Sequence, residues 1–396
     1  MKTELSTLII IVAIAAVVPL LVGLLRIKVA QVVLLLVGGI ICGPSVLGWI
    51  NIDEPITLLS ELGLGLLFFL AGMELEARSM RGRSGKLAAT GWITSVVLAL
   101  GLSGLLAASG VVKDFAGFAI ALTSTALGTL LPILRDNGRL GGRFGTYFMG
   151  AGAWGELGPI IAIAVFLSTR SSWAALLTLV IFFTIALCVG MLSNVFRAER
   201  IRSLVMGGYT TSSQTGVRIA MLTVVLFLGL AVGFGFDAVL GAFVAGIIAR
   251  RLVPREEESP LELRLEAVAF GFFVPIFFVV SGAKLDIDSI IANPVPMLLA
   301  FVALFLVRAL PQFVIYRHAI PDRAERASFA LLVGTALPII VAITTIEVNA
   351  GAMTSSSAAA LVGAGALTVL IFPIASSFFE KRIKNSVDAE PAELAR

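Results

Sequence analysis

Apolar residues follow one another in long runs along the whole chain, and charged residues gather in the short segments between them. Most runs contain about 20 residues, which as a helix is enough to cross a hydrocarbon core about 30 Å thick. We therefore predict thirteen membrane-spanning helices. Their expected positions are 6–25, 29–48, 56–74, 87–109, 114–133, 146–168, 173–192, 216–234, 236–250, 266–284, 296–316, 325–347 and 357–379.

The composition is typical of a membrane protein. Of the 396 residues, 58% are hydrophobic and only 14% are charged, whereas soluble domains carry about 25% charged residues. An outer-membrane barrel would instead show alternating segments of about ten residues. The predicted fold class is therefore an all-α polytopic membrane protein.

Residues that commonly carry catalysis or bind metals are scarce. Cys42 and Cys188 both lie in apolar runs, and the single histidine, His318, lies at a helix end among loop charges. This pattern favours neither a disulfide framework nor a histidine-based metal site. The chain shows no nucleophile–base pair and no phosphate-binding loop, so we expect neither an enzyme nor a bound cofactor. Because the excess of basic residues lies in loops, it suggests membrane topology rather than nucleic-acid binding.

The basic residues of the loops divide unequally between the two sides of the membrane. With the predicted spans, 24 lie on one side and four on the other, and Arg308 belongs to neither. Cytoplasmic loops carry the excess of lysine and arginine. We therefore predict a multi-pass protein of the cell (inner) membrane with its N-terminus outside and its C-terminus in the cytoplasm.

Three segments recur later in the chain at nearly one offset. They are LLFFLAGMELEARSM (66–80) with PIFFVVSGAKLDIDSI (275–290), TALGTLLPIL (125–134) with TALPIIVAIT (335–344), and GAGAWGELGP (150–159) with GAGALTVLIFP (363–373). The matched spans are seven apart, an odd number, so the copies run in opposite directions. Inverted-topology repeats are typical of secondary transporters, whose sites lie near the midplane of the membrane.

The fifth and twelfth spans each contain residues that interrupt a helix. Proline cannot donate its backbone hydrogen bond, and unwound backbone is tolerated at membrane depth only beside a cavity or other polar groups. Ordinary proline kinks are the alternative, but because the repeat relates the two helices we predict crossed, unwound helices. The expected breaks involve the polar run Thr123, Ser124, Thr125 and the breakers Gly128, Pro132, Gly334, Thr335 and Pro338.

Two opposite charges occupy the centres of the sixth and eleventh spans. Glu156 and Arg308 each lie about ten residues from the ends of their spans, and intramembrane charges are costly and usually functional. One reading is a static ion pair that locks two helices. The other is a carrier site in which a proton and a cation alternate on Glu156 while Arg308 balances the charge. A single titratable group then predicts one proton per monovalent cation, which is electroneutral exchange.

Several motifs resemble those of one transporter family. They are GGIICGPSVLG (38–48), ELGLGLLFFLAGMELE (61–76), TSTALGTLLPILRD (123–136), GAFVAGIIA (241–249), FFVPIFFVVSG (272–282) and VRALP (307–311). Together they make the chain similar to the second branch of the monovalent cation:proton antiporter superfamily, with the sodium/proton exchanger fold. The resemblance covers nearly the whole chain, to about residue 380, and it implies transport of Na⁺ or K⁺ and a role in pH homeostasis.

The resemblance also implies an architecture. The protein is expected to be a homodimer whose mobile core carries the ion across the membrane in an elevator-like way, past a dimerisation panel. The panel would comprise 1–85 and 216–290, and the core 86–192 and 291–380. A cytoplasmic linker is expected at 193–215 and a cytoplasmic tail at 381–396.

The site residues implied by the resemblance are those singled out above. Glu156 matches the ion-binding aspartate of the sixth span, and Arg308 matches the basic residue that faces it. The unwound segment near the ion corresponds to Thr123, Ser124 and Thr125.

The chain also departs from the family pattern. Relatives usually carry Asp-Asp, Asn-Asp or Gln-Asp where this chain has Gly155-Glu156, and Gly152, one turn earlier, supplies no oxygen. Few ligands are left for a dehydrated sodium ion. This leaves K⁺, or another cationic or organic solute exported with proton coupling on the same fold, as alternatives. A cation channel, in which Glu156 and Arg308 would form a gate or filter, is a separate and less favoured alternative.

Overall fold

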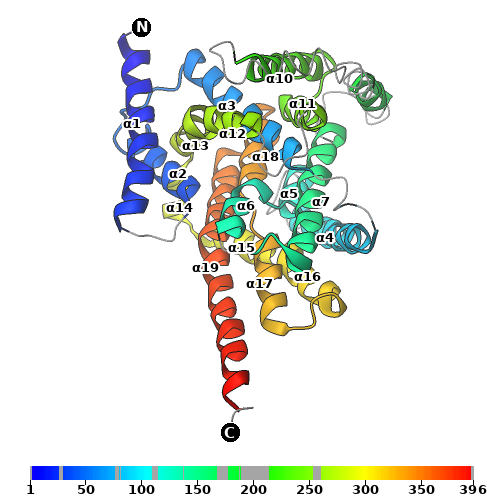
Figure 1. Cartoon of the computed structure of the whole chain (residues 1–396). Coiled ribbons are helices and arrows are strands. Elements are labelled where there is room, and N and C mark those ends of the chain that lie inside the picture. Colours follow the sequence, from blue (N-terminus) through cyan, green and yellow to red (C-terminus); the bar gives the residue numbers. More distant parts are fainter. Residues whose placement is uncertain are drawn as a thin grey trace. The chain divides into compact units, whose positions relative to one another are not determined.

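The computed structural model describes residues 2–25, 30–75, 80, 82–108, 115–136, 138–166, 177–186, 188, 214–252 and 260–393. All regular elements in these ranges are helices (Figure 1). Nine of these helices are long and apolar enough to cross a membrane, and four shorter apolar helices accompany them. All thirteen coincide with the predicted spans, which confirms the all-helical membrane fold for the described part of the chain. The predicted linker lies outside these ranges except for its last two residues.

The chain divides into two compact units. Unit 1 comprises residues 1–25, 34–75 and 160–284, and unit 2 comprises residues 26–33, 76–159 and 285–396. The predicted core segment 86–192 is thereby divided between the units at residue 160. The assignment of a dimerisation panel and a mobile core stays a prediction.

Unit 1 is built mainly around α3. Its helices are α1 (Lys2–Leu25), most of α2 (Gln31–Cys42), α3 (Glu54–Glu74), α10 (Thr215–Gly233), α11 (Ala238–Leu252), α12 (Pro260–Val268) and α13 (Val274–Ala283), together with Leu177–Ala186 and a π-helical turn at Ala269–Phe273. Gly72 of α3 lies against the carbonyl of Phe243, and Gly246 of α11 lies against the carbonyl of Phe69. Small residues allow membrane helices to approach this closely, so the two glycines bring α3 and α11 together.

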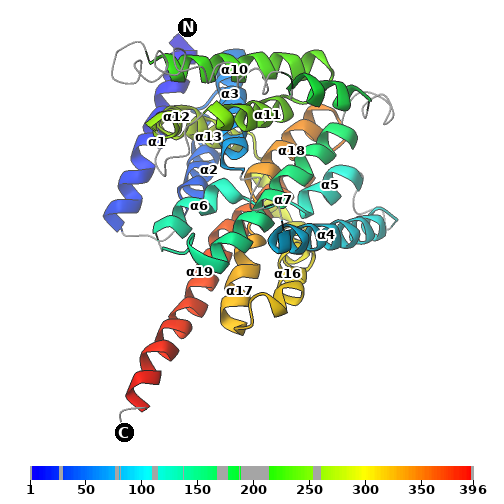
Figure 2. The same cartoon turned by 45° about the vertical axis from the view of Figure 1, so that its right-hand side comes forward.

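Unit 2 contains two helices that are interrupted in the middle. Its helices are α4 (Gly82–Ala108), α5 (Phe115–Leu122), α6 (Leu127–Asp136), most of α7 (Gly142–Phe166), α14 (Ile287–Ala292), α15 (Val295–Leu304), α16 (Leu310–Ile315), α17 (Arg323–Val333), α18 (Pro338–Asn349) and α19 (Ser355–Glu393). A π-helical turn at Phe305–Ala309 joins α15 to α16, and a 3₁₀ turn follows at Tyr316–His318. Figure 2 labels α4 to α7 and α16 to α19.

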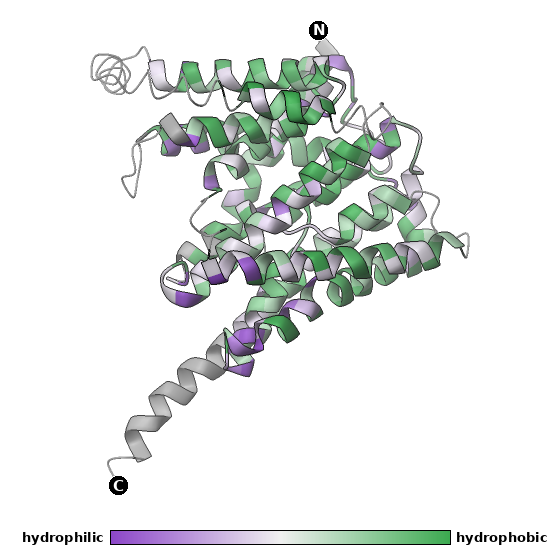
Figure 3. Ribbon diagram, turned by 90° about the vertical axis from the view of Figure 1, so that its right-hand side faces the viewer, coloured by the Kyte–Doolittle hydropathy of each residue, from purple (hydrophilic) through white to green (hydrophobic). Residues whose placement is uncertain are grey.

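Some boundaries differ from the predicted ones for local reasons. The second span ends at Cys42 rather than near residue 48, because Pro44 cannot continue the helix and the chain turns so that Trp49 and Ile50 donate to the carbonyl of Cys42. The last span continues beyond residue 379, so the described part of the predicted tail extends α19. Figure 3 shows that most residues of the helices are hydrophobic. Exposed leucines such as Leu20 and Leu24 of α1 suit contact with lipid.

Candidate functional site

The two interruptions in unit 2 meet each other. Residues 124–126 between α5 and α6 and residues 335–337 between α17 and α18 lie outside any helix. The backbone N–H of Ala126 donates to the carbonyl of Thr335 over 2.7 Å, and the hydroxyl of Thr125 donates to the carbonyl of Val333 over 2.7 Å. The polar backbone of each segment is therefore partly satisfied by the other, as membrane burial requires. The predicted crossed, unwound helices are present.

The expected helix-breaking residues act in different ways. Pro338 is the first residue of α18, where its missing N–H has no cost. Gly334 caps the C-terminus of α17, and the side chain of Thr335 donates back to the carbonyl of Leu331. Pro132 lies inside α6, beyond the break. The interruption before α6 therefore falls at the polar residues rather than at the proline.

Glu156 lies on α7 and reaches the start of α6. Its side chain is only 5% exposed. One carboxylate oxygen, Oε1, accepts hydrogen bonds from the backbone N–H groups of Leu127 at 2.9 Å and Gly128 at 3.3 Å. These are the first residues of α6, whose free N–H groups and helix dipole favour a negative charge. The other oxygen, Oε2, is buried and has no hydrogen-bond partner within the described residues.

Arg308 is held by neutral oxygens. Its side chain is 1% exposed. Nε donates to the hydroxyl of Thr125 at 2.9 Å and Nη2 donates to the carbonyl of Ala151 at 3.0 Å, while Nη1 has no partner in the described part of the chain. Among the described residues, no ion pair within 4.0 Å joins Arg308 to Glu156. The direct ion pair that equal depth suggests is not formed, and a charge-balancing role for Arg308 stays a prediction.

Gly155 is surrounded by the groups that hold Arg308. A Cβ atom at this position would collide with Nη2 of Arg308 and with the side chain of Thr125. The carbonyl of Gly155 accepts the backbone N–H of Thr125 at 3.0 Å. The guanidinium therefore occupies the space that a side chain at position 155 would need.

Thr123 and Ser124 are buried at the end of α5. Their hydroxyls donate to the carbonyls of Ile120 and Ala121, both at 2.8 Å. With the hydrogen atoms directed back to the helix, the two oxygens keep acceptor lone pairs. No hydrogen bond joins either residue to Glu156 in the described structure, so their role as cation ligands stays a prediction.

Four polar residues of unit 2 that are buried or half-buried were not singled out from the sequence. Gln312 and Tyr316 follow Arg308 at intervals of four residues, and Trp92 lies on α4 beside Gly158. Glu347 is a second buried acid, 4% exposed, on α18. The spacing Arg308, Gln312, Tyr316 within an apolar run is a signal that could have identified the first two.

Acidic residues also lie at the ends of helices in unit 1. Asp237, between α10 and α11, is partly buried, and its carboxylate accepts the N–H of Val239 at 2.8 Å. Burial raises the pKa of Asp237, the hydrogen bond from Val239 lowers it, and the nearby charge of Glu61 raises it further. These groups lie outside unit 2, which contains Glu156.

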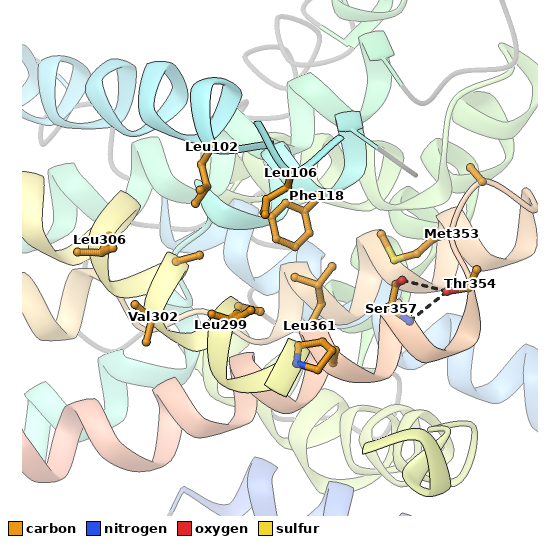
Figure 4. Close-up of a pocket in the computed structure, with 15 residues that line it drawn as sticks. Leu102, Leu106, Phe118, Leu299, Val302, Leu306, Met353, Thr354, Ser357 and Leu361 are labelled. Atoms are coloured by element: carbon orange, nitrogen blue, oxygen red, sulfur yellow. Dashed lines mark hydrogen bonds between the residues drawn. The ribbon is translucent and has the colours of Figure 1, made fainter. Parts of the chain in front are cut away.

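A cavity in unit 2 lies apart from the charged residues. It has a volume of about 290 Å³. Figure 4 shows Leu102, Leu106 and Phe118 on one side, facing Leu299 and Leu361, with Thr354 and Ser357 at one end. None of its lining residues is a predicted site residue. The lining is almost wholly apolar, so it offers little to replace the water around an ion.

Comparisons with known proteins identify a family of similar sequences. A family model described as "Sodium/hydrogen exchanger, transmembrane" matches residues 12–380. The putative Na(+)/H(+) antiporter YjbQ of Bacillus subtilis is 26% identical over 96% of this chain and 64% of the relative, and the Na(+)/H(+)-K(+) antiporter GerN of Bacillus cereus is 30% identical over 64% of this chain and 65% of the relative. The chain thus spans about two thirds of the length of these relatives.

Solved structures give the same fold. The sodium proton antiporter MjNhaP1 of Methanocaldococcus jannaschii superposes with a TM-score of 0.62 and 18% sequence identity, covering 95% of this chain and 99% of that chain. At this identity the match shows the shared fold and leaves the transported ion open.

Proposed function

Since the chain belongs to the sodium/hydrogen exchanger family, we propose that it exchanges a monovalent cation for protons across the membrane. The relatives support this proposal, because their names describe Na⁺/H⁺ antiporters and, for the KefC proteins of Klebsiella pneumoniae and Salmonella, glutathione-regulated potassium efflux. We propose that the protein acts as a transporter and not as an enzyme. We propose Na⁺ or K⁺ as the cation.

The arrangement of Glu156 carries this proposal. One oxygen is fixed by the two N–H groups at the start of α6, and the other is buried without a partner in the described structure. The second oxygen, Oε2, can take a proton or contribute to a cation site. A carboxylate that holds a proton has little affinity for a cation, and one that holds a cation has little affinity for a proton. Binding of the two is therefore exclusive, and exclusive binding couples their flows.

The surroundings of the carboxylate suggest a stoichiometry of one to one. Because residue 155 is glycine, no second acid lies beside Glu156. Arg308 occupies the space that a side chain at position 155 would need. An arginine stays protonated at physiological pH, so Arg308 adds no titratable group. One proton then exchanges for one monovalent cation, which moves no net charge.

We further propose the elevator-like cycle of the family. All the residues of the site, on α5 to α7 and on the segment from residue 305 to 338, belong to unit 2, so the site can move as one body. The proposed assembly is a homodimer in the cell (inner) membrane, with its N-terminus outside and its C-terminus in the cytoplasm.

The available ligands bear on the choice of cation. The side chain of Leu127 fills the space beside Gly152, so no oxygen is supplied there. Oxygen ligands would come from Glu156, the acceptor lone pairs of Thr123 and Ser124, the carbonyls of the unwound backbone, and water. A site with so few ligands favours K⁺ or a larger organic cation over a dehydrated Na⁺. A proton-coupled exporter of such an organic solute is therefore the second candidate function.

Reconstituted vesicles that contain a pH-sensitive dye test the proposal. A pH gradient is imposed, and Na⁺, K⁺, Li⁺ or choline is added in turn to wild type, Glu156→Gln and the control Glu54→Gln, which changes an exposed acid at the start of α3. We expect one or more cations to dissipate the gradient in wild type and in the control but not in Glu156→Gln. Transport of choline alone would favour the organic-solute candidate, and full activity in Glu156→Gln would place the site elsewhere. A membrane-potential dye tests electroneutrality, since a sustained current would contradict it.

A further inference from the structure

Three buried polar side chains follow one another along one face of the helical segment that carries Arg308. Arg308, Gln312 and Tyr316 are 1%, 1% and 0% exposed. Residues four apart lie on one face of a helix, about 6 Å from one another. Within the described structure, Nη1 of Arg308, both atoms of the Gln312 amide and the hydroxyl of Tyr316 have no hydrogen-bond partner.

Helix α4 supplies a further group to this face. The Gln312 amide lies directly against Gly91, where a Cβ atom would collide with it. The next residue, Trp92, packs its indole over Gly158 of α7, and its Nε1 is likewise buried without a partner in the described residues. We call Arg308, Gln312, Tyr316 and Trp92 the polar row.

Such a concentration of unsatisfied groups is unusual. More than about 90% of buried polar atoms in proteins have a hydrogen-bond partner, either protein or ordered water. Buried waters typically make about three hydrogen bonds with polar groups that the protein itself leaves unpaired. The polar row offers donors from Arg308 and Trp92 and both donor and acceptor atoms from Gln312 and Tyr316, which is the chemistry that retains water.

The two ends of the polar row lie where a proton path would need them. At one end Arg308 contacts Gly155, the residue before Glu156, whose Oε2 is also unpartnered in the described structure. At the other end Tyr316 is followed by the exposed residues Arg317 and His318. The eight residues from Arg308 to Tyr316 span about 12 Å at 1.5 Å per residue.

We propose that ordered water molecules occupy the polar row and carry protons between Glu156 and the Arg317–His318 end of the helix. At each step a water or the Tyr316 hydroxyl accepts a proton on oxygen and releases another, and Glu156 is the final acceptor. Gln312 and Trp92 only hold and orient water. The ionised carboxylate of Glu156 offsets the charge of Arg308 while a proton moves. The proton-conducting role rests on the proposed exchange function, whereas the presence of water does not.

The water is tested without transport by brief X-ray radiolysis, which generates hydroxyl radicals from water, followed by mass spectrometry of the oxidised side chains. In wild type we expect Tyr316 to be oxidised although its side chain is 0% exposed, and the half-buried Trp92 to be oxidised as well. The exposed Trp49 is the positive control, and Phe278, which is fully buried in unit 1, is the negative control. Gln312→Leu should lower oxidation of Trp92 and Tyr316. Protection of Tyr316 in wild type would overturn the proposal.

The proton path is tested in the vesicle assay. Gln312→Leu removes the central amide and Gly91→Ala displaces it, so each should slow cation-driven proton movement by about tenfold or more, while the cation concentration for half-maximal rate changes less than about twofold. Gly101→Ala, on the same helix α4, is the control, because no neighbouring atom lies within 4 Å of the added methyl group. Wild-type rates in Gln312→Leu would refute the path. An inactive wild type would refute the exchange function. The oxidation result would still decide whether water occupies the polar row.

Discussion

A methyl group added at position 155 should disturb the groups that hold Arg308 directly. In Gly155→Ala the new Cβ would meet Nη2 of Arg308 and both Oγ1 and Cβ of Thr125. Neither neighbour can withdraw freely. The Thr125 hydroxyl bridges Arg308 to the carbonyl of Val333, and Nη2 is bonded to the carbonyl of Ala151. Relief of the collision therefore breaks hydrogen bonds of a buried guanidinium.

The magnitude follows from those bonds. Overpacking a tight interior costs about 1–3 kcal/mol. Hydrogen bonds to charged groups contribute about 1.5–3 kcal/mol each, and at least one of the two bonds of Arg308 must lengthen. We expect Gly155→Ala to destabilise the protein by about 2–5 kcal/mol, even though alanine gains up to about 1 kcal/mol over glycine in a helix.

Thermal unfolding in detergent, followed by intrinsic fluorescence, measures the effect. Gly101→Ala is the matched control because it adds the same methyl group to an open helical position, and it should unfold at the wild-type temperature or slightly above. Gly152→Ala should give an intermediate result, since its new Cβ meets only the movable side chain of Leu127. Equal unfolding temperatures for Gly155→Ala and Gly101→Ala would show that Arg308 does not occupy this space.

Two further changes test the unwound segment and the acid of unit 1. Thr125→Val should destabilise by about 2–4 kcal/mol in the same unfolding assay, because Nε of Arg308 and the carbonyl of Val333 each lose a buried partner, and Thr125→Ser should restore most of the loss. Asp237 has a raised pKa in the folded protein, so its protonation favours folding and wild-type stability should fall as pH rises above the ordinary value of about 3.9. Asp237→Asn should flatten that fall, and an unchanged pH profile would contradict it.

The apolar runs predicted the position of every described membrane helix because burial in lipid demands length and hydrophobicity from each span separately. Boundaries were less predictable where local hydrogen bonding decides them. The turn after Cys42 depends on Trp49 and Ile50 returning to its carbonyl, a contact that no periodicity signals. The unwound segments were predictable from the polar run at Thr123 and from Pro338, whereas Pro132 misleads because it lies inside α6.

The site was predictable in its residues but not in its contacts. Glu156 and Arg308 are recognisable because charges at membrane depth are rare. Their actual partners are backbone groups and a threonine hydroxyl, which become neighbours only when the two unwound segments cross. Gln312 and Tyr316 were missed for a related reason. Polar, uncharged residues in an apolar run attract little notice until the structure shows that their polar atoms have no partner among the described residues.

The separate solvation of the two charges suits an exchange site better than an ion pair would. In a close pair with Arg308, both carboxylate oxygens of Glu156 could be engaged by a permanent charge, and release of either partner would leave the other buried alone at high cost. Here the N-terminus of α6 holds one oxygen of Glu156, and Thr125 and Ala151 hold Arg308. The positive charge therefore keeps its position whether a proton or a cation occupies the carboxylate. Arg308 lies more than 4.0 Å from the carboxylate, and its charge still lowers the free-energy cost of ionising Glu156. It does so without competing for Oε2, the oxygen that a proton or a cation would occupy.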